Sequence, residues 1–205
     1  MMNFLEHVKK NKTEMIKNVK KLLQFESVRV DDLDNVEAPF GEGIRKSLDF
    51  CLELGKEFGF KVANVDNIAG HLEFGEGEEI LGILCHLDVV PAGSGWTYPP
   101  FSATEVDGRI YARGAIDDKG PTISVIYALK ILKDLNIIPN KRIRIILGTD
   151  EETSWYGIKR YLEKYEMPTI GFAPDANFPL IYAEKGIMSL SLESHFKSNL
   201  IISFS

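Results

Sequence analysis

Apolar residues recur along the chain in two patterns that predict alternating helices and strands. Helical spacing of these residues predicts four helices, at residues 3–25, 42–58, 122–135 and 156–164. Shorter apolar runs bounded by Gly, Pro, Asn and Asp predict strands at residues 61–65, 69–74, 80–91, 109–111, 142–148, 169–173 and 180–182. Because strands alternate with helices through most of the chain, the sequence predicts an α/β fold with a mixed, largely parallel sheet flanked by helices.

The run at 80–91 has the character of a buried central strand that ends in polar side chains. Its unbroken apolar character favours a strand that is covered on both faces. His86 and Asp88 lie near its carboxyl end, and a side-chain period of two places them on the same side. Asp88 can then accept a hydrogen bond from the ring nitrogen of His86 that binds no metal. Taken alone, a His-x-Asp pair more often marks a buried structural histidine than a metal ligand.

Carboxylates occupy comparable positions elsewhere in the chain. Asp117 precedes a predicted helix, whereas Glu151, Glu152 and Asp175 follow predicted strands. Taken alone, the adjacent Asp117 and Asp118 are explained more simply as helix caps. The carboxyl ends of strands gather along one edge of an open α/β sheet, so these side chains are expected to converge with the histidine. One histidine with several carboxylates suits zinc or a similar divalent ion, and the excess of carboxylates suits two ions that share a ligand.

Composition and charge argue against some classes of partner and indicate the cellular compartment. The chain has 205 residues with 24 basic and 30 acidic side chains, which predicts one main domain and argues against nucleic acid or an anionic membrane as the main partner. No segment approaches the roughly 20 apolar residues of a membrane span and no signal-peptide core is present, so we expect a cytoplasmic protein without membrane contact. Cys51 and Cys85 are interpreted as small core residues, and His71 as a structural histidine.

Three motifs together resemble a known family. They are His-Leu-Asp at 86–88, Gly-Ala-Ile-Asp-Asp-Lys-Gly at 114–120 and Asp-Glu-Glu at 150–152. Together they are similar to the signatures of a family of di-zinc peptidases. This family includes aminoacylase, acetylornithine deacetylase, succinyl-diaminopimelate desuccinylase, carboxypeptidase G and carnosinase. Within that family, the segments 96–101, 173–177 and 184–186 look most like the bacterial dipeptidase V branch. The resemblance runs from the first predicted helix to about residue 192.

The resemblance implies a set of metal ligands. His86, Asp117 and Asp175 would hold one zinc, and Asp117 would bridge to a second ion that Glu152 also binds; manganese or cobalt could replace zinc. The resemblance also implies a cis peptide bond between Asp117 and Asp118.

Catalytic roles follow from the same resemblance. Asp88 would orient the histidine, and Glu151 would take a proton from a water that bridges the metals and pass it to the leaving amine. The implied reaction is hydrolysis of a small dipeptide with a free carboxylate.

The sequence departs from the family pattern near its end. The family takes a histidine for its second metal from a later part of a longer chain, and its lid domain is inserted where this sequence stops. No motif makes His195 that ligand. We therefore expect residues 1–186 to form the N-terminal part of a catalytic domain, truncated before the lid domain, and 187–205 to form the start of a truncated or altered lid segment. The C-terminal part of the same enzyme would be the missing partner, and the chain alone would be weakly active or inactive.

Other functions remain open from the residues. A related amidohydrolase that removes acyl groups from N-acyl amino acids would use the same ligands, and a non-catalytic metal-binding remnant would bind zinc without turnover. A magnesium-dependent phosphatase-like hydrolase would also use clustered carboxylates. The histidine His86 beside the acids, and the lack of a phosphate-binding Gly loop, argue against that last class.

Overall fold

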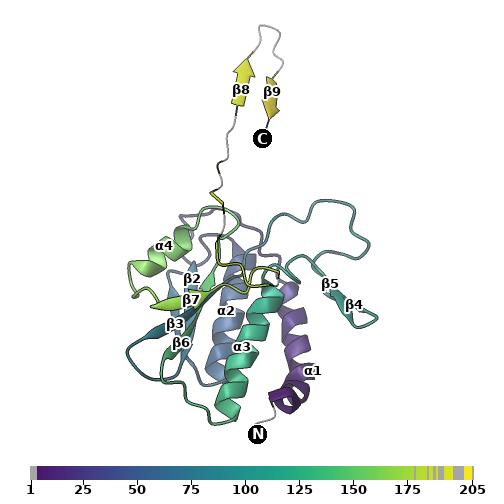
Figure 1. Ribbon diagram of the computed structural model, residues 1–205. Helices are drawn as coiled ribbons and strands as arrows, with labels where there is room; N and C mark the ends of the chain where they lie inside the picture. Colours follow the sequence, from purple (N-terminus) through teal and green to yellow (C-terminus); the bar gives the residue numbers. More distant parts are fainter. Residues whose placement is uncertain are drawn as a thin grey trace. The chain divides into compact units, whose positions relative to one another are not determined.

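The computed structural model describes residues 4–177, 179–183, 185–186, 188, 192–195 and 201–204 (Figure 1). The chain divides into two compact units, Met1–Asp175 and Ala176–Ser205. In the second unit, β8 (Leu192–His195) pairs in antiparallel fashion with β9 (Ile201–Phe204). The division into a catalytic part up to residue 186 and a lid segment beyond it stays a prediction.

A five-stranded mixed sheet forms the centre of the first unit. Its strands are β1 (Lys61–Val65), β2 (Ala69–Phe74), β3 (Ile80–His86), β6 (Arg142–Gly148) and β7 (Ile170–Phe172), in the order β1-β2-β6-β3-β7. β3 is parallel to β6 and β7, whereas β2 is antiparallel to β1 and β6. Four strands therefore run in one direction and β2 runs in the other, which confirms the predicted mixed, largely parallel sheet.

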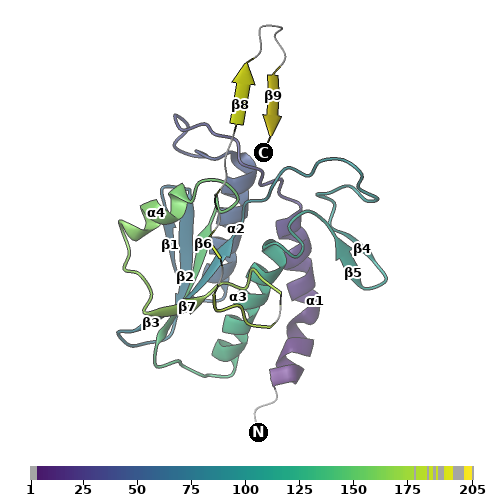
Figure 2. The ribbon, with the colours of Figure 1, turned by 45° about the horizontal axis from the view of Figure 1, so that its top comes forward.

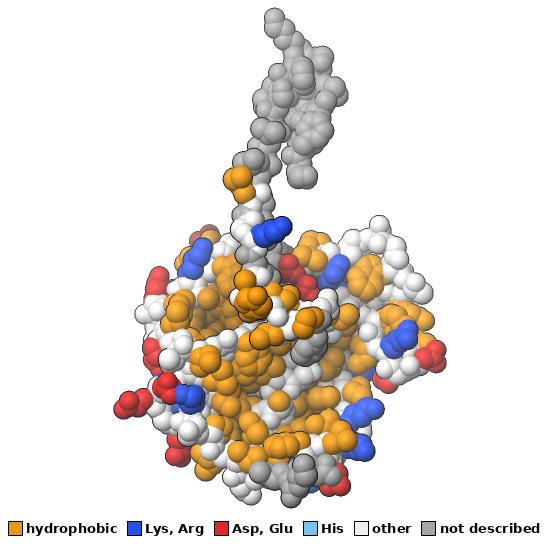
Figure 3. Space-filling model, in the orientation of Figure 1, with side chains coloured by type: hydrophobic (Ala, Val, Ile, Leu, Met, Phe, Trp, Pro, Cys, Tyr) orange, Lys and Arg blue, Asp and Glu red, His pale blue; other side chains and the backbone are white. Residues whose placement is uncertain are grey.

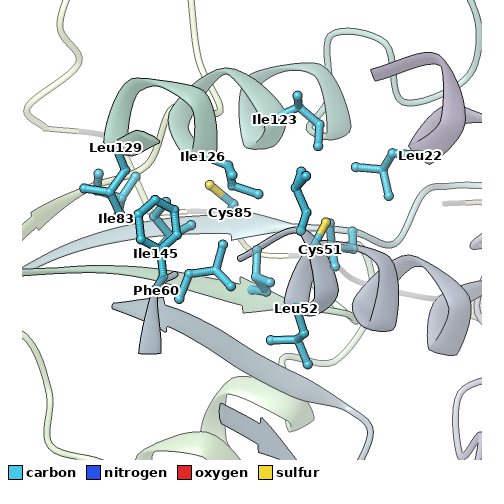
Figure 4. Close-up of a cluster of buried hydrophobic side chains, with 14 of the residues drawn as sticks. Leu22, Cys51, Leu52, Phe60, Ile83, Cys85, Ile123, Ile126, Leu129 and Ile145 are labelled. Atoms are coloured by element: carbon cyan, nitrogen blue, oxygen red, sulfur yellow. The ribbon is translucent and has the colours of Figure 1, made fainter. Parts of the chain in front are cut away.

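Three helices cover one face of this sheet, and a short helix lies on the other (Figures 1 and 2). The three are α1 (Phe4–Leu23), α2 (Glu42–Glu57) and α3 (Lys119–Asp134), and the short one is α4 (Tyr156–Leu162). The larger core lies between the three helices and alternate residues of the strands, among them Ile83 and Ile145 (Figure 4). Cys51 and Cys85 are buried there as free thiols, in agreement with their predicted core role. None of the described helices combines the length and the apolar character that crossing a bilayer requires.

The opposite face of the sheet is only partly covered. Tyr161 of α4 packs against Ile146 and its neighbours. Beside α4, apolar residues of β3, β7 and α4 line an open hollow of about 420 Å³, and Phe172 is 47% exposed. Figure 3 shows apolar side chains gathered on this side of the molecule, where α4 and β7 lie in Figure 1.

Several predicted boundaries differ from those observed. The central strand β3 ends at His86 rather than continuing to residue 91. Helix α3 begins at Lys119 and not at the predicted residue 122. The apolar periodicity starts only after Pro121, but a proline is tolerated in the first turn of a helix, so the helix includes it. The strand β4 (Thr104–Val106), which pairs with β5 (Arg109–Tyr111), was not predicted, since its residues are only partly buried. Residues 180–182, predicted as a strand, form none.

His71 on β2 gives a pH-dependent stability prediction. Its buried ring lies against Tyr161 and Tyr165, with Nδ1 2.8 Å from the Tyr161 hydroxyl, and burial together with the Arg144 charge lowers the pKa of His71 from 6.5 to about 4. Between these pH values the unfolded chain binds a proton that the folded chain does not, so stability rises with pH across that window. On acidification from pH 7 to pH 4.5, we expect the free energy of unfolding of the wild type to fall by about 2 kcal/mol more than that of His71→Gln. Urea unfolding at both pH values measures this difference, and equal losses in the two proteins would contradict it.

Candidate metal centre

The structure brings together the residues that the sequence placed at strand ends. Ligand atoms of His86, Asp117 and Asp175 all lie within 4.8 Å of one another, and so do those of His86, Glu151 and Glu152. They come from the ends of β3, β6 and β7 and from the turn before α3, at one edge of the sheet. The predicted convergence is therefore present, and the histidine belongs to both groups.

The two ring nitrogens of His86 face different partners. Nδ1 is 3.0 Å from the backbone carbonyl of Asp88 and 3.5 Å from its carboxylate. Nε2 is 2.9 Å from Asp117 Oδ1 and 3.5 Å from Asp175 Oδ2. Because a carbonyl oxygen only accepts, Nδ1 carries a proton, and Nε2 is the nitrogen directed at the carboxylates. This is the arrangement that a metal-binding histidine requires.

The charge around His86 is strongly negative. Burial alone would lower the pKa of this imidazole, but the hydrogen bond to Asp88 and the charges of Asp88, Asp118 and Asp175 raise it to about 10. The positive charge of a protonated His86 balances part of the negative charge of the carboxylate cluster. A divalent cation between Nε2 and the two carboxylates would balance more of it, and the donor set of one imidazole and two carboxylates suits zinc.

Asp88 has a second contact that the sequence did not predict. Its carboxylate is 1% exposed and accepts hydrogen bonds from the backbone N–H groups of Glu151 and Glu152, each at 3.1 Å. The shorter contact with His86 is made by the Asp88 carbonyl. The parallel pairing of His86 with Gly148 could have indicated this, because it places the residues beyond β3 next to those beyond β6.

Glu151 and Glu152 are half-buried beside the same cluster. Burial raises the pKa of Glu151, and the charges of Asp175, Asp88 and Asp117 raise it further against the opposing effect of His86. Burial also raises the pKa of Glu152, followed by the charge of Asp117. Both carboxyl groups therefore keep a proton to a higher pH than an exposed glutamate does, and a nearby cation would oppose this.

The turn before α3 orients two consecutive aspartates differently. The peptide bond between Asp117 and Asp118 is cis, as the resemblance implied. The Asp117 side chain is 59% exposed beside His86 Nε2, whereas Asp118 is fully buried and its Oδ2 accepts the backbone N–H of His86 at 3.1 Å. Burial raises the pKa of Asp118 to about 7. The sequence did not predict the contact between the Asp118 carboxylate and the backbone of His86, which helps to hold the histidine in place.

Two of the motifs that carry the family resemblance, 173–177 and 184–186, lie at or beyond the end of the first unit. Asp175 is the last residue of that unit and follows β7. In the motif 184–186, Glu184 lies outside the described residues. The individual roles of the ligands, of Asp88 and of Glu151 stay predictions.

Comparisons with known proteins agree with this geometry. The family model "Peptidase family M20/M25/M40" matches residues 82–194, more than half of the chain. A Bacillus subtilis protein named "Putative dipeptidase YtjP" is 53% identical over 191 residues, which are 93% of this chain and 41% of that protein. A Staphylococcus epidermidis protein named "Putative dipeptidase" is 51% identical over 187 residues, 91% of this chain and 40% of that protein. This chain thus spans about 40% of the length of these relatives.

Solved structures share the fold over most of this chain. Human carnosine dipeptidase 1 superposes with a TM-score of 0.67 at 24% identity, over 78% of this chain and 37% of that one. An M20 family metallo-carboxypeptidase from Sulfolobus solfataricus superposes with a TM-score of 0.65 at 26% identity, over 80% of this chain and 37% of that one. The motifs, the clustered ligands and these matches together show that the chain belongs to peptidase family M20/M25/M40, a family of metallopeptidases.

Proposed function

We propose that this chain is the metal-binding part of a zinc-dependent dipeptidase. The observation that carries the proposal is the pair of ligand groups that share His86 at one edge of the sheet. The names of the relatives at about 50% identity support peptide hydrolysis with dipeptides as substrates. The expected compartment is the cytoplasm, and neither nucleic acid nor a membrane is an expected partner.

The first group matches the ligand set that the resemblance implies for one zinc, whereas the pairing of Asp117 with Glu152 at a second ion comes from the resemblance alone. His86, Asp117 and Asp175 would hold the first zinc, and Asp117 with Glu152 would contribute to a second; manganese or cobalt are the alternatives. When bound, the metal polarises the scissile carbonyl and lowers the pKa of the attacking water toward neutrality.

The protein residues then supply orientation and proton transfer. Asp88 holds His86 through Nδ1 and holds the Glu151–Glu152 backbone through two N–H groups. Glu151 is the general base, since its carboxylate lies in the cluster and burial raises its pKa toward the range in which a base works best. It accepts the proton of the attacking water and transfers it to the leaving amine, which completes hydrolysis of the peptide bond.

Because this chain spans about 40% of its relatives, activity is best tested in a chimera in which it replaces the matching 191 residues of the Bacillus subtilis relative. We expect the chimera to hydrolyse dipeptides, to lose this activity on dialysis against EDTA, and to regain it with zinc. The chain alone serves as the comparison and should turn over slowly or not at all. N-acyl amino acids in the same assay test the deacylase alternative.

Two outcomes would contradict the proposal. Preferential hydrolysis of N-acyl amino acids would favour the related amidohydrolase. A chimera that binds zinc without hydrolysing either class of substrate would favour the non-catalytic remnant.

A further inference from the structure

Asp150 precedes the two glutamates and makes contacts that the proposed chemistry does not use. Its carboxylate is fully buried and accepts four hydrogen bonds. The donors are the Ser154 hydroxyl at 2.8 Å, the backbone N–H groups of Tyr156 at 2.6 Å and Gly157 at 2.9 Å, and Arg29 Nη1 at 3.1 Å. Asp150 therefore joins the start of the glutamate-bearing loop to the beginning of α4.

Arg29 reaches this loop from the segment that follows α1. Its Nη1 also donates to the hydroxyls of Thr153 at 2.9 Å and Ser154 at 2.6 Å, so one guanidinium contacts three residues of the loop. The guanidinium carbon lies 4.0 Å from the centroid of the Phe40 ring, and the side chain is only 16% exposed. A buried carboxylate requires a compensating charge, which Arg29 supplies.

The segment that carries Arg29 is itself fixed to the residues that follow β3. The Ser27 hydroxyl donates to the carbonyl of Leu87 at 2.6 Å, and the N–H of Val89 donates to the carbonyl of Ser27 at 3.1 Å. These contacts flank Asp88, which holds the N–H groups of both glutamates. The glutamates are thus held by Asp88 on one side and by the Arg29–Asp150 pair on the other.

We propose that Arg29 and Asp150 are positioning residues that fix the backbone of Glu151 and Glu152 at the metal centre. The functional meaning of this positioning rests on the proposed function, whereas the positioning itself is a property of the chain without metal or substrate. The competing explanation is an ion pair that only stabilises the fold as a whole.

Amide hydrogen exchange on the full chain separates the two explanations. In Arg29→Met, we expect protection of the Glu151 and Glu152 amides to fall about 10- to 100-fold, the range for loss of a hydrogen bond to a charged group. Protection of amides in the central strands, such as Ile83 and Ile145, should change much less, because local opening of the loop does not open the sheet. Asp150→Asn should give the same local pattern.

Two further variants complete the comparison. Arg45→Met is the matched control, because Arg45 is 24% exposed and forms ion pairs with Asp49 at 2.7 Å and Glu37 at 3.7 Å, neither of which belongs to the loop; it should leave the glutamate amides unchanged. Arg29→Lys keeps the charge, but its one Nζ replaces both the Nη1 that contacts the loop and the Nε that donates to Asp31 at 2.7 Å, so it should restore part of the protection. Should Arg29→Met fail to fold, a selective loss at the two glutamates in Arg29→Lys decides the question.

The outcomes distinguish this proposal from the dipeptidase proposal. Unchanged protection at Glu151 and Glu152, or an equal loss at these amides and in the central strands, would overturn the positioning role even if the chimera is an active dipeptidase. A selective loss supports it whatever substrate the chimera cleaves. If the chimera is a dipeptidase, Arg29→Met should also lower its kcat more than it changes its KM, because the substitution displaces the general base Glu151 and leaves the substrate contacts in place.

Discussion

In the chimera, replacing Glu151 with alanine is expected to lower turnover by about two to four orders of magnitude, the usual contribution of a general base. The zinc content should stay nearly unchanged, because this glutamate is assigned to the water and not to the metal. Steady-state kinetics together with metal analysis of the purified protein measures both quantities.

Glu152→Ala is the matched comparison one residue further along the same loop. Both glutamates lie in the cluster with His86, and Asp88 holds both through their backbone N–H groups. Because Glu152 is assigned as a ligand, its removal should lower the zinc content. If Glu151→Ala loses zinc and Glu152→Ala keeps it, the two assignments are reversed.

His86→Ala is expected to weaken the tightest zinc site of the chain by more than about 100-fold. Loss of a group that only supports a ligand typically costs about 10- to 100-fold in metal affinity, so loss of a ligand in both groups should exceed that range. Competition with a chromophoric chelator measures the affinity. His7→Ala is the control, since it removes a histidine from α1 without touching the cluster.

The sequence predicted the framework of the fold because local signals agreed with the tertiary structure. The strands β1 and β2 have the predicted bounds, since the turn between them holds Asp66 and Asn67 at positive φ, a conformation that these residue types tolerate. Four of the five clustered residues were predictable for a similar reason, because parallel strands bring their carboxyl ends to one edge, whereas Asp117 joins them from the turn before α3.

The supporting contacts could not be predicted in the same way. Arg29 lies in an irregular segment, and only the folded chain places it beside Asp150, 121 residues later. The Asp88 carboxylate contacts the glutamate N–H groups because β3 ends at His86, so the two-residue side-chain period does not apply at Asp88. Contacts between irregular segments leave no periodic signal in a sequence.

Zinc binding to the purified chain tests the central claim most directly. His86, Asp117 and Asp175 offer one histidine and two carboxylates, whereas the second position has only Asp117 and Glu152 among its assigned ligands. A titration should therefore show close to one tightly bound zinc per chain, and that zinc should be lost in His86→Ala. A chain that binds no zinc tightly, or a His86→Ala variant with unchanged zinc affinity, would contradict the assignment of this cluster as a metal centre.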